Sequence, residues 1–99
     1  RSIGIELVNR GRYPDWFDTR SQNNHEPYPE AQVEALITLI TFLCEKLPGL
    51  VEIAGHEELD RDRVPASDQP ELTVARKTDP GPTFPWARIE GATGLVRLP

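Results

Sequence analysis

Four side chains in this sequence are of the types that metal-assisted hydrolysis uses: Glu6, His56, Lys77 and Asp79. A catalytic zinc ion commonly takes three protein ligands of histidine and carboxylate type and leaves one position open for water. Such a site also needs a carboxylate base near the water and a cation near the developing oxyanion. The four residues supply these types, but one metal ligand is missing, because His25 is the only other histidine.

Each of these residues also has a plain structural explanation. His56 follows Gly55 where a strand is expected to end, and it could be an ordinary hydrogen-bonded turn histidine. Asp79 lies in "TDPG", where an aspartate side chain can cap its own turn. Lys77 and Glu6, taken singly, are typical of solvent-exposed side chains. The combination is what suggests a site, because α/β sheets place their sites where strand ends open onto loops.

The composition argues against two classes of partner. The net charge of −5 and the pI of about 4.9 disfavour nucleic acid, because phosphate contacts need a basic face. No apolar run reaches the roughly 18 residues that a membrane span requires.

Cys44 is the single cysteine, so the chain can form neither an internal disulfide nor a thiolate metal cluster.

The N-terminal third is expected to form a strand and a long loop. "SIGIELV", residues 2–8, alternates apolar side chains with a period of two, as a strand does, and points Glu6 away from them. Residues 9–29 are rich in Asn, Gly, Pro and charge, and they indicate a loop. Loops longer than about 12–15 residues are usually functional or mobile. The aromatic residues of this loop either cover a groove or pin the loop down: Tyr13, Trp16 and Phe17.

The clearest element is a helix in residues 29–48. Pro29 suits the first helical position, Glu30 lies at the favourable end of the helix dipole, and Pro48 ends the helix. Apolar residues at spacings of three and four form one stripe that we expect to be buried: Val33, Leu36, Ile37, Ile40, Leu43, Cys44 and Leu47. Leu39 and Phe42 widen the stripe, so we expect the helix to pack deeply against a sheet.

The rest of the chain completes an α/β pattern. A second strand is expected in residues 50–56, and a helix between strands indicates a βαβ-like unit. Residues 57–75 show no sustained period, and the prolines from this passage onward disfavour regular structure. "PWARIEG", residues 85–91, predicts a short final helix.

Four segments carry a family resemblance: "SIGIELVN", "YPEAQVEALITLI", "IAGHEELD" and "RKTDPGPTFPW". Together and in this order they resemble the second half of the zinc-dependent N-acetylmuramoyl-L-alanine amidases of the AmpD type. That family is related in fold to the peptidoglycan recognition proteins. The resemblance covers most of the chain and implies an α/β fold with a central mixed β-sheet flanked by helices. It also implies Zn²⁺ as cofactor and hydrolysis of the amide between N-acetylmuramic acid and L-alanine in peptidoglycan or muropeptides.

The resemblance assigns a role to each of the four residues. His56 resembles the family's second histidine ligand of zinc, and Asp79 resembles its aspartate ligand. Glu6 resembles the acidic residue implicated as general base, and Lys77 the basic group that stabilises the tetrahedral oxyanion. Cys44 falls on the helix stripe, where we interpret it as a core residue.

The chain departs from the family pattern at two places. The family's other histidine ligand lies on an earlier strand, and His25 lies in a loop where the motif has no ligand. We therefore expect residues 1–99 to be the C-terminal portion of a single amidase catalytic domain within a longer protein, with weakened zinc affinity in isolation. Residues 57–75 form a longer passage than in compact members, and we interpret them as a loop insertion. This insertion could lie over the substrate groove, bind a partner domain or be a neutral surface loop.

Two other classes of function compete with the amidase. A non-catalytic muropeptide-binding module is the main alternative, but such modules typically lose a zinc ligand, whereas His56 and Asp79 both remain. An acidic interaction domain that docks through the long helix would leave a broad apolar stripe exposed, which risks aggregation. The resemblance implies a bacterial or phage origin, and the cytoplasm is favoured over the periplasm. Whether the substrate is intact peptidoglycan or a freed anhydromuropeptide stays open, as does the oligomeric state.

Overall fold

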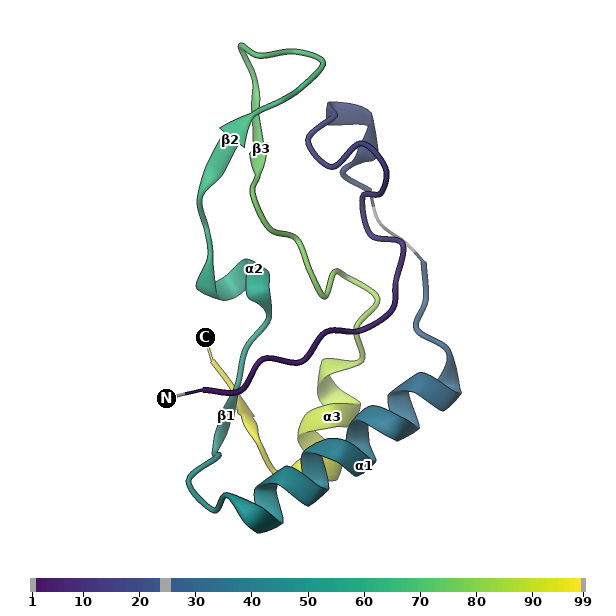
Figure 1. The fold of residues 1–99 in the computed structure, drawn as a ribbon, viewed down its shortest axis with the longest axis vertical. Coiled ribbons are helices and arrows are strands. Elements are labelled where there is room, and N and C mark those ends of the chain that lie inside the picture. Colours follow the sequence, from purple (N-terminus) through teal and green to yellow (C-terminus); the bar gives the residue numbers. More distant parts are fainter. Residues whose placement is uncertain (1, 24–25, 99) are drawn as a thin grey trace.

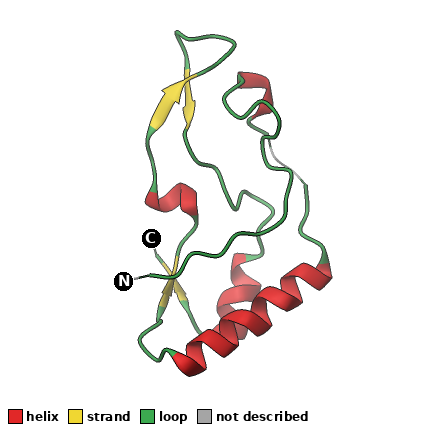
Figure 2. Ribbon diagram, in the orientation of Figure 1, coloured by secondary structure: helices red, strands yellow, loops and turns green. Residues whose placement is uncertain are grey.

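The computed structural model describes residues 2–23 and 26–98, which form an elongated molecule of 47 × 28 × 18 Å. Two helices and a strand pair lie at one end, and a hairpin with a helical turn lies at the other (Figures 1 and 2). Chain order gives the elements as η1 Thr19–Ser21, α1 Glu30–Lys46, β1 Glu52–Ile53, α2 His56–Leu59, β2 Arg63–Pro65, β3 Thr73–Ala75, α3 Trp86–Thr93 and β4 Val96–Arg97.

The long helix α1 confirms the expected element and supplies one side of the core. Its stripe buries Val33, Leu36 and Ile40, and Cys44 packs against this cluster as expected. Leu39 and Phe42 do not widen the buried stripe, because 43% and 53% of their surface is exposed, and Leu47, expected within the stripe, is 44% exposed. The expectation of deep packing against a sheet is therefore wrong. A narrower stripe is enough, because α1 packs against a second helix, α3.

The helix α3, also expected, closes the other side of the core and connects two parallel strands. Strands β1 and β4 pair in parallel, with the Val96 N–H donating to the Val51 carbonyl oxygen at 3.0 Å. Ile89 on α3 has no exposed surface at all. Gly94 ends α3 with a φ of 77°, a left-handed conformation that glycine adopts without a side-chain penalty. Strand β1 comprises two residues of the second strand expected in residues 50–56. The connection that contains α3 joins β1 to β4, the C-terminal strand.

Residues 57–75 do contain regular structure, which corrects the expectation from their proline content. Strands β2 and β3 form an antiparallel hairpin in which Val64 lies opposite Val74. Pro65 is compatible with the hairpin because β2 belongs to a two-stranded sheet and is therefore an edge strand, where a residue without an N–H is tolerated. Ala66 and Val74 are buried, although neither belongs to the core cluster that α1 and α3 form.

The N-terminal segment is extended but forms no strand in the described structure, so the expectation of a strand in residues 2–8 is wrong. The Gln32 side chain of α1 takes the place of a partner strand. Its Oε1 accepts from the Val8 N–H at 2.7 Å, and its Nε2 donates to the Val8 carbonyl oxygen at 3.0 Å. Leu7 packs against the core, whereas Ile3 and Ile5 are exposed, so burial does not follow the period of two.

Helices with parallel and antiparallel strands confirm the expected α/β class. Within the described residues the strands form two separate pairs, one parallel and one antiparallel. None of the helices described here has both the length and the apolar character needed to cross a membrane.

Candidate active site

The structure brings together His56 and Asp79, which are far apart in the sequence. His56 is the first residue of α2, and its Nδ1 lies 3.2 Å from Oδ2 of Asp79. A second contact ties the same two segments, because the Glu57 N–H donates to the Asp79 carbonyl oxygen at 3.0 Å. The α2 N-terminus and the "TDPG" turn thus form one unit, in which the Asp79 side chain faces a histidine.

Gly55 allows the close approach of the two segments. A Cβ at this position would lie 2.8 Å from Cδ of Pro80 and 3.2 Å from Cζ2 of Trp86. The backbone of Gly55 is extended, with φ −80° and ψ 154°, so its conformation alone does not require glycine. Steric exclusion by Pro80 and Trp86, and not backbone conformation, therefore explains why the residue before His56 is a glycine.

An ion pair between Glu58 and Arg97 holds α2 in place. Glu58 accepts a hydrogen bond from the Gly55 N–H at 2.8 Å and from Arg97 Nε at 3.3 Å. The Arg97 guanidinium lies 4.0 Å from the centre of the Trp86 ring, a cation–π distance. The Tyr28 hydroxyl donates to the Pro80 carbonyl oxygen at 2.6 Å. These contacts link both His56 and Asp79 to the core.

The facing donor atoms fit two ligands of one metal ion. Zinc bonds to nitrogen and oxygen are about 2.0–2.2 Å long, so two donors 3.2 Å apart can share one ion. Both side chains are accessible from solvent, at 47% for His56 and 64% for Asp79. Residues 2–23 and 26–98 contain no group of three His, Cys, Asp or Glu that could hold a metal ion. They therefore offer two candidate ligands, His56 and Asp79, and His25 lies outside the described residues.

Lys77 and Glu6, the other two predicted site residues, lie in different surroundings. Lys77 lines a hollow of about 310 Å³ together with Arg12, Trp16, Phe17 and Arg76. It precedes Asp79 by two positions, on the same extended segment. Glu6 is exposed on the N-terminal segment, and no hydrogen bond within the described residues joins it to His56 or Asp79. The structure thus brings together two of the four residues, and Lys77 is close in sequence to one of them, Asp79.

Two groups near the pair have pKa values that the charge of Asp79 helps to raise. Burial raises the pKa of the Glu57 carboxyl, and the charges of Glu58 and Asp79 raise it further. Burial is also the largest cause of the raised pKa of the Tyr28 hydroxyl, and the Asp79 charge is the next.

Arg12 is a further residue of this region, and no motif in the sequence points to it. Its buried guanidinium donates to the carbonyl oxygens of Ala75 at 2.6 Å and Arg76 at 2.7 Å, directly before Lys77. Burial lowers its pKa, and the charge of Asp79 opposes that effect. No local pattern marks Arg12, because the two carbonyl groups that its guanidinium binds are more than sixty positions away in the chain.

Comparison with known proteins identifies the family. The family model described as N-acetylmuramoyl-L-alanine amidase matches residues 1–82, and the chain belongs to this family. The predicted membership is therefore confirmed.

Two curated relatives match nearly the whole chain. N-acetylmuramoyl-L-alanine amidase AmiD of Escherichia coli K12 is 33% identical over 88 residues, which cover 89% of this chain and 26% of that protein. 1,6-anhydro-N-acetylmuramyl-L-alanine amidase AmpD of Enterobacter cloacae is 36% identical over 89 residues, which cover 89% of this chain and 34% of that protein. The chain therefore spans about a quarter to a third of the length of these relatives. No solved structure matches it significantly.

Proposed function

We propose that the protein containing this chain is a zinc-dependent hydrolase of the amide bond between N-acetylmuramic acid and L-alanine, acting on peptidoglycan or muropeptides. The contact between His56 Nδ1 and Asp79 Oδ2 at 3.2 Å carries the proposal. It places a histidine and a carboxylate side by side, and both are ligand types that zinc takes in proteins. Membership of the amidase family and the names of both relatives support the same chemistry.

His56 and Asp79 would hold the metal. When bound, zinc polarises a carbonyl group and makes water more acidic. The third protein ligand is proposed to come from outside the described residues, because those residues supply only two. Gly55 and the Glu57 N–H keep the two ligands at their present spacing by fixing α2 against the "TDPG" turn.

Two further side chains are proposed to act on the substrate. Glu6 would accept a proton from the attacking water and pass it to the nitrogen of the leaving L-alanine as the C–N bond breaks. Lys77 would stabilise the negative charge on the carbonyl oxygen with its ammonium group. Within the described residues Lys77 forms no ion pair, so its charge is not already neutralised by a protein carboxylate.

The turnover of a Glu6→Gln variant tests the role of Glu6 as general base separately from the role of zinc. The full-length protein is depleted of metal, zinc is restored, and release of the new amine from a muramyl-L-alanyl peptide is followed. We expect zinc to restore cleavage, and Glu6→Gln to lower kcat by about 100-fold or more with little change in affinity for the peptide. Glu45→Gln, on the exposed face of α1, is the matched control and should keep the wild-type rate.

Two outcomes would contradict the proposal. Wild-type rates for Glu6→Gln would exclude Glu6 as general base. A zinc-loaded wild-type protein that binds the peptide without cleaving it would be a muropeptide-binding module instead of an amidase.

A further inference from the structure

Arg12 is a buried cation to which the proposed mechanism gives no task. Only 5% of its surface is exposed, and within the described residues it forms no ion pair. Its Nη1 donates to the Ala75 carbonyl oxygen at 2.6 Å, and its Nη2 donates to the Arg76 carbonyl oxygen at 2.7 Å. Burying a charge costs free energy unless hydrogen bonds compensate, and here two backbone carbonyl groups supply that compensation. The guanidinium therefore fixes the backbone that it binds.

The two carbonyl groups lie at the bend that leads from the hairpin to Lys77. Strand β3 ends at Ala75, and the chain bends at Arg76. Successive carbonyl groups of a straight strand point to opposite sides, so one guanidinium binds two in a row only where the chain changes direction. The planar fork of an arginine holds two oxygen atoms in fixed relative positions. Arg12 thereby sets the direction in which the backbone carries Lys77.

A second set of contacts, from the segment after α2, holds the same bend. The Arg76 N–H donates to the Asp62 carbonyl oxygen at 2.8 Å, and the Arg76 guanidinium pairs with the Asp60 carboxylate. Arg76 is thus bound through its N–H, its carbonyl oxygen and its side chain. Lys77, the next residue, therefore starts from a fixed point of the backbone.

Asp79, two residues after Lys77, has anchors of its own. The Glu57 N–H donates to the Asp79 carbonyl oxygen at 3.0 Å, and the Tyr28 hydroxyl donates to the carbonyl oxygen of the next residue at 2.6 Å. Neither contact involves Arg12. A change at Arg12 should therefore move Lys77 and leave the proposed zinc ligands in place.

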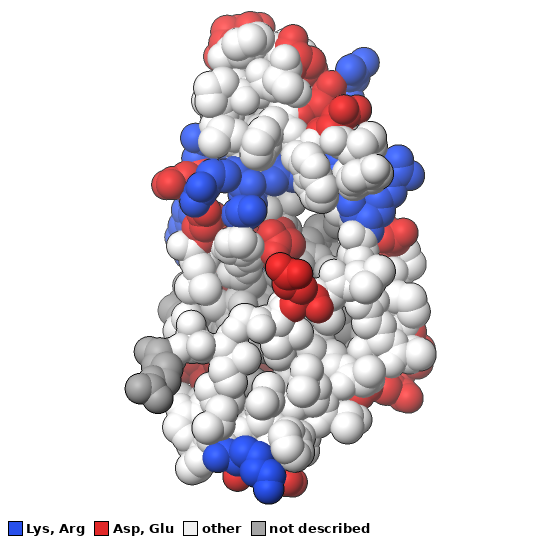
Figure 3. Space-filling model, in the orientation of Figure 1, with Lys and Arg blue, Asp and Glu red and all other residues white. Residues whose placement is uncertain are grey.

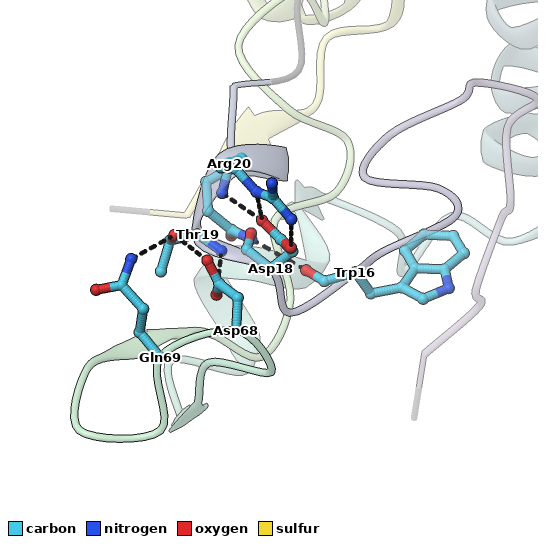
Figure 4. Close-up of polar contacts among 7 residues, drawn as sticks. Trp16, Asp18, Thr19, Arg20, Asp68 and Gln69 are labelled. Carbon is cyan, nitrogen blue, oxygen red and sulfur yellow. Dashed lines mark hydrogen bonds and ion pairs between the residues drawn. The ribbon is translucent and has the colours of Figure 1, made fainter.

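Arg12 itself belongs to a loop that is held against the hairpin. We call residues 11–22 the aromatic loop, after its three aromatic side chains. The Thr19 N–H and hydroxyl donate to the Asp68 carboxylate at 2.9 and 2.6 Å (Figure 4). At the end of the loop, the Gln22 Oε1 accepts from Arg12 Nη1 at 3.0 Å. The loop thus presents the guanidinium in one orientation.

A lysine that stabilises an oxyanion depends on such positioning. The Lys77 ammonium is one charge on a flexible four-carbon stem, so its reach depends on the backbone from which the stem starts. Electrostatic stabilisation of a transition state is effective when the donor is in place before the reaction. Figure 3 shows Lys and Arg side chains gathered in a band across the upper half of one face, so positive charge alone does not distinguish Lys77. Its place on an anchored backbone does.

We propose that Arg12 is a positioning residue that fixes the bend at Arg76 and so directs the Lys77 ammonium to the carbonyl oxygen of the amide that is cleaved. The inference rests on the proposed amidase function, in which Lys77 stabilises the negative charge on that oxygen. In this role Arg12 does not touch the substrate and acts through Lys77. Zinc binding by His56 and Asp79 is independent of it.

Arg12→Lys in the full-length protein tests this role. Lysine keeps the charge and most of the stem, but it replaces the planar fork with one nitrogen and cannot hold both carbonyl groups as arginine does. We expect kcat on a muramyl-L-alanyl peptide to fall by about 10–100-fold, because a misplacement of about 1 Å can cost about 100-fold. KM and the zinc Kd should stay within about twofold, since the Lys77 charge acts on the transition state alone.

Arg63→Lys is the matched control. The Arg63 guanidinium also binds β3, donating to the Thr73 carbonyl oxygen at 2.7 Å and to the Thr73 hydroxyl at 2.9 Å. This contact does not hold the bend before Lys77, so the variant should keep the wild-type kcat. Gln22→Ala leaves Arg12 in place and removes its third acceptor. It should lower kcat by a smaller factor, and it decides the question if Arg12→Lys does not fold.

A Lys77→Met background separates positioning from a structural role. Removing one oxyanion donor costs about 100–1,000-fold in kcat. If Arg12 acts through Lys77, adding Arg12→Lys to Lys77→Met should lower kcat further by less than about twofold. A structural role would instead multiply the two losses.

NMR relaxation tests the positioning without turnover. Backbone order parameters of about 0.85 mark a rigid segment, and values below about 0.6 mark a flexible one. We expect the N–H groups of Lys77 and Thr78 to be rigid in the wild type, more mobile in Arg12→Lys and unchanged in Arg63→Lys. The same spectra show whether each variant is folded.

The positioning inference and the amidase proposal fail in different ways. Wild-type kcat in Arg12→Lys, an equal loss in Arg63→Lys, or losses that multiply in the double variant would overturn the positioning inference. So would a parallel loss of zinc affinity, because Arg12 would then support the whole site and not Lys77. A wild-type protein that leaves the peptide uncut would defeat the amidase proposal, and unchanged order parameters in Arg12→Lys would separately show that Arg12 does not fix the bend.

Discussion

Replacing Gly55 with alanine should disturb the candidate active site through one steric clash, with the ring of Pro80. The added Cβ would lie 2.8 Å from Cδ of Pro80, whereas carbon atoms at optimal separation lie about 3.5–4.0 Å apart. The Pro80 ring or α2 must therefore move by about 0.7 Å or more. Adding a methyl group to such a packed position costs about 1–3 kcal/mol. The φ of −80° suits alanine, so the backbone adds no strain of its own.

Urea unfolding followed by tryptophan fluorescence, together with a zinc titration, measures both consequences. We expect Gly55→Ala to lower the free energy of unfolding by about 1–3 kcal/mol and to weaken zinc binding, because Asp79 precedes the displaced Pro80. Gly91→Ala is the matched control. Gly91 lies in α3, where an added methyl group would meet no atom within 4 Å, so alanine there should stabilise by about 0.5–1 kcal/mol. A Gly55→Ala protein as stable and as zinc-competent as the wild type would refute the close-approach argument.

Three further predictions concern the core, the N-terminal segment and the aromatic loop. Ile89→Ala removes a side chain with no exposed surface and should lower the free energy of unfolding by about 2–5 kcal/mol in urea titrations. A loss below about 1 kcal/mol would contradict the position of Ile89 at the centre of the core. Gln32→Ala removes both hydrogen bonds to the Val8 backbone and should lower the free energy of unfolding by about 1 kcal/mol. Hydrogen exchange of the Val8 amide should become faster, and unchanged exchange would argue against these two hydrogen bonds. The Arg20 hydrogen bonds lower the pKa of Asp18 from 3.8 to about 2, so their stabilisation is present above pH 3.8 and is lost as the pH falls towards 2. An NMR titration should find this low pKa in the wild type and a higher one in Arg20→Ala, and equal values would exclude the pairing.

Elements with strong local signals were predictable from the sequence. The helix that became α1 has apolar spacing of three and four between clear end signals, and the structure bounds it at Glu30 and Lys46. The pairing of His56 with Asp79 was reached through motif resemblance, and the structure shows the contact itself.

Features that depend on distant partners were not predictable. The alternation in residues 2–8 indicates a strand, but a strand also needs a neighbour, and here the Gln32 side chain bonds the Val8 backbone instead. The hairpin in residues 57–75 could not be predicted from proline content alone, because Pro65 is tolerated on β2, an edge strand of a two-stranded sheet. Arg12 carries no signal in the sequence because its burial depends on carbonyl groups of β3 and the residue after it.

The most direct test of the central claim is a comparison of His56→Ala, Asp79→Asn and the double variant by kcat/KM on a muramyl-L-alanyl peptide. Even residues behind the ligands of a metal site contribute about 10–100-fold, so losing either ligand should cost about 100-fold or more. Because residues that act as one unit are not additive, the double variant should be about as inactive as each single variant. Asp62→Asn serves as the control and should keep the wild-type rate. Single variants with wild-type activity, or losses that multiply in the double variant, would contradict a shared site.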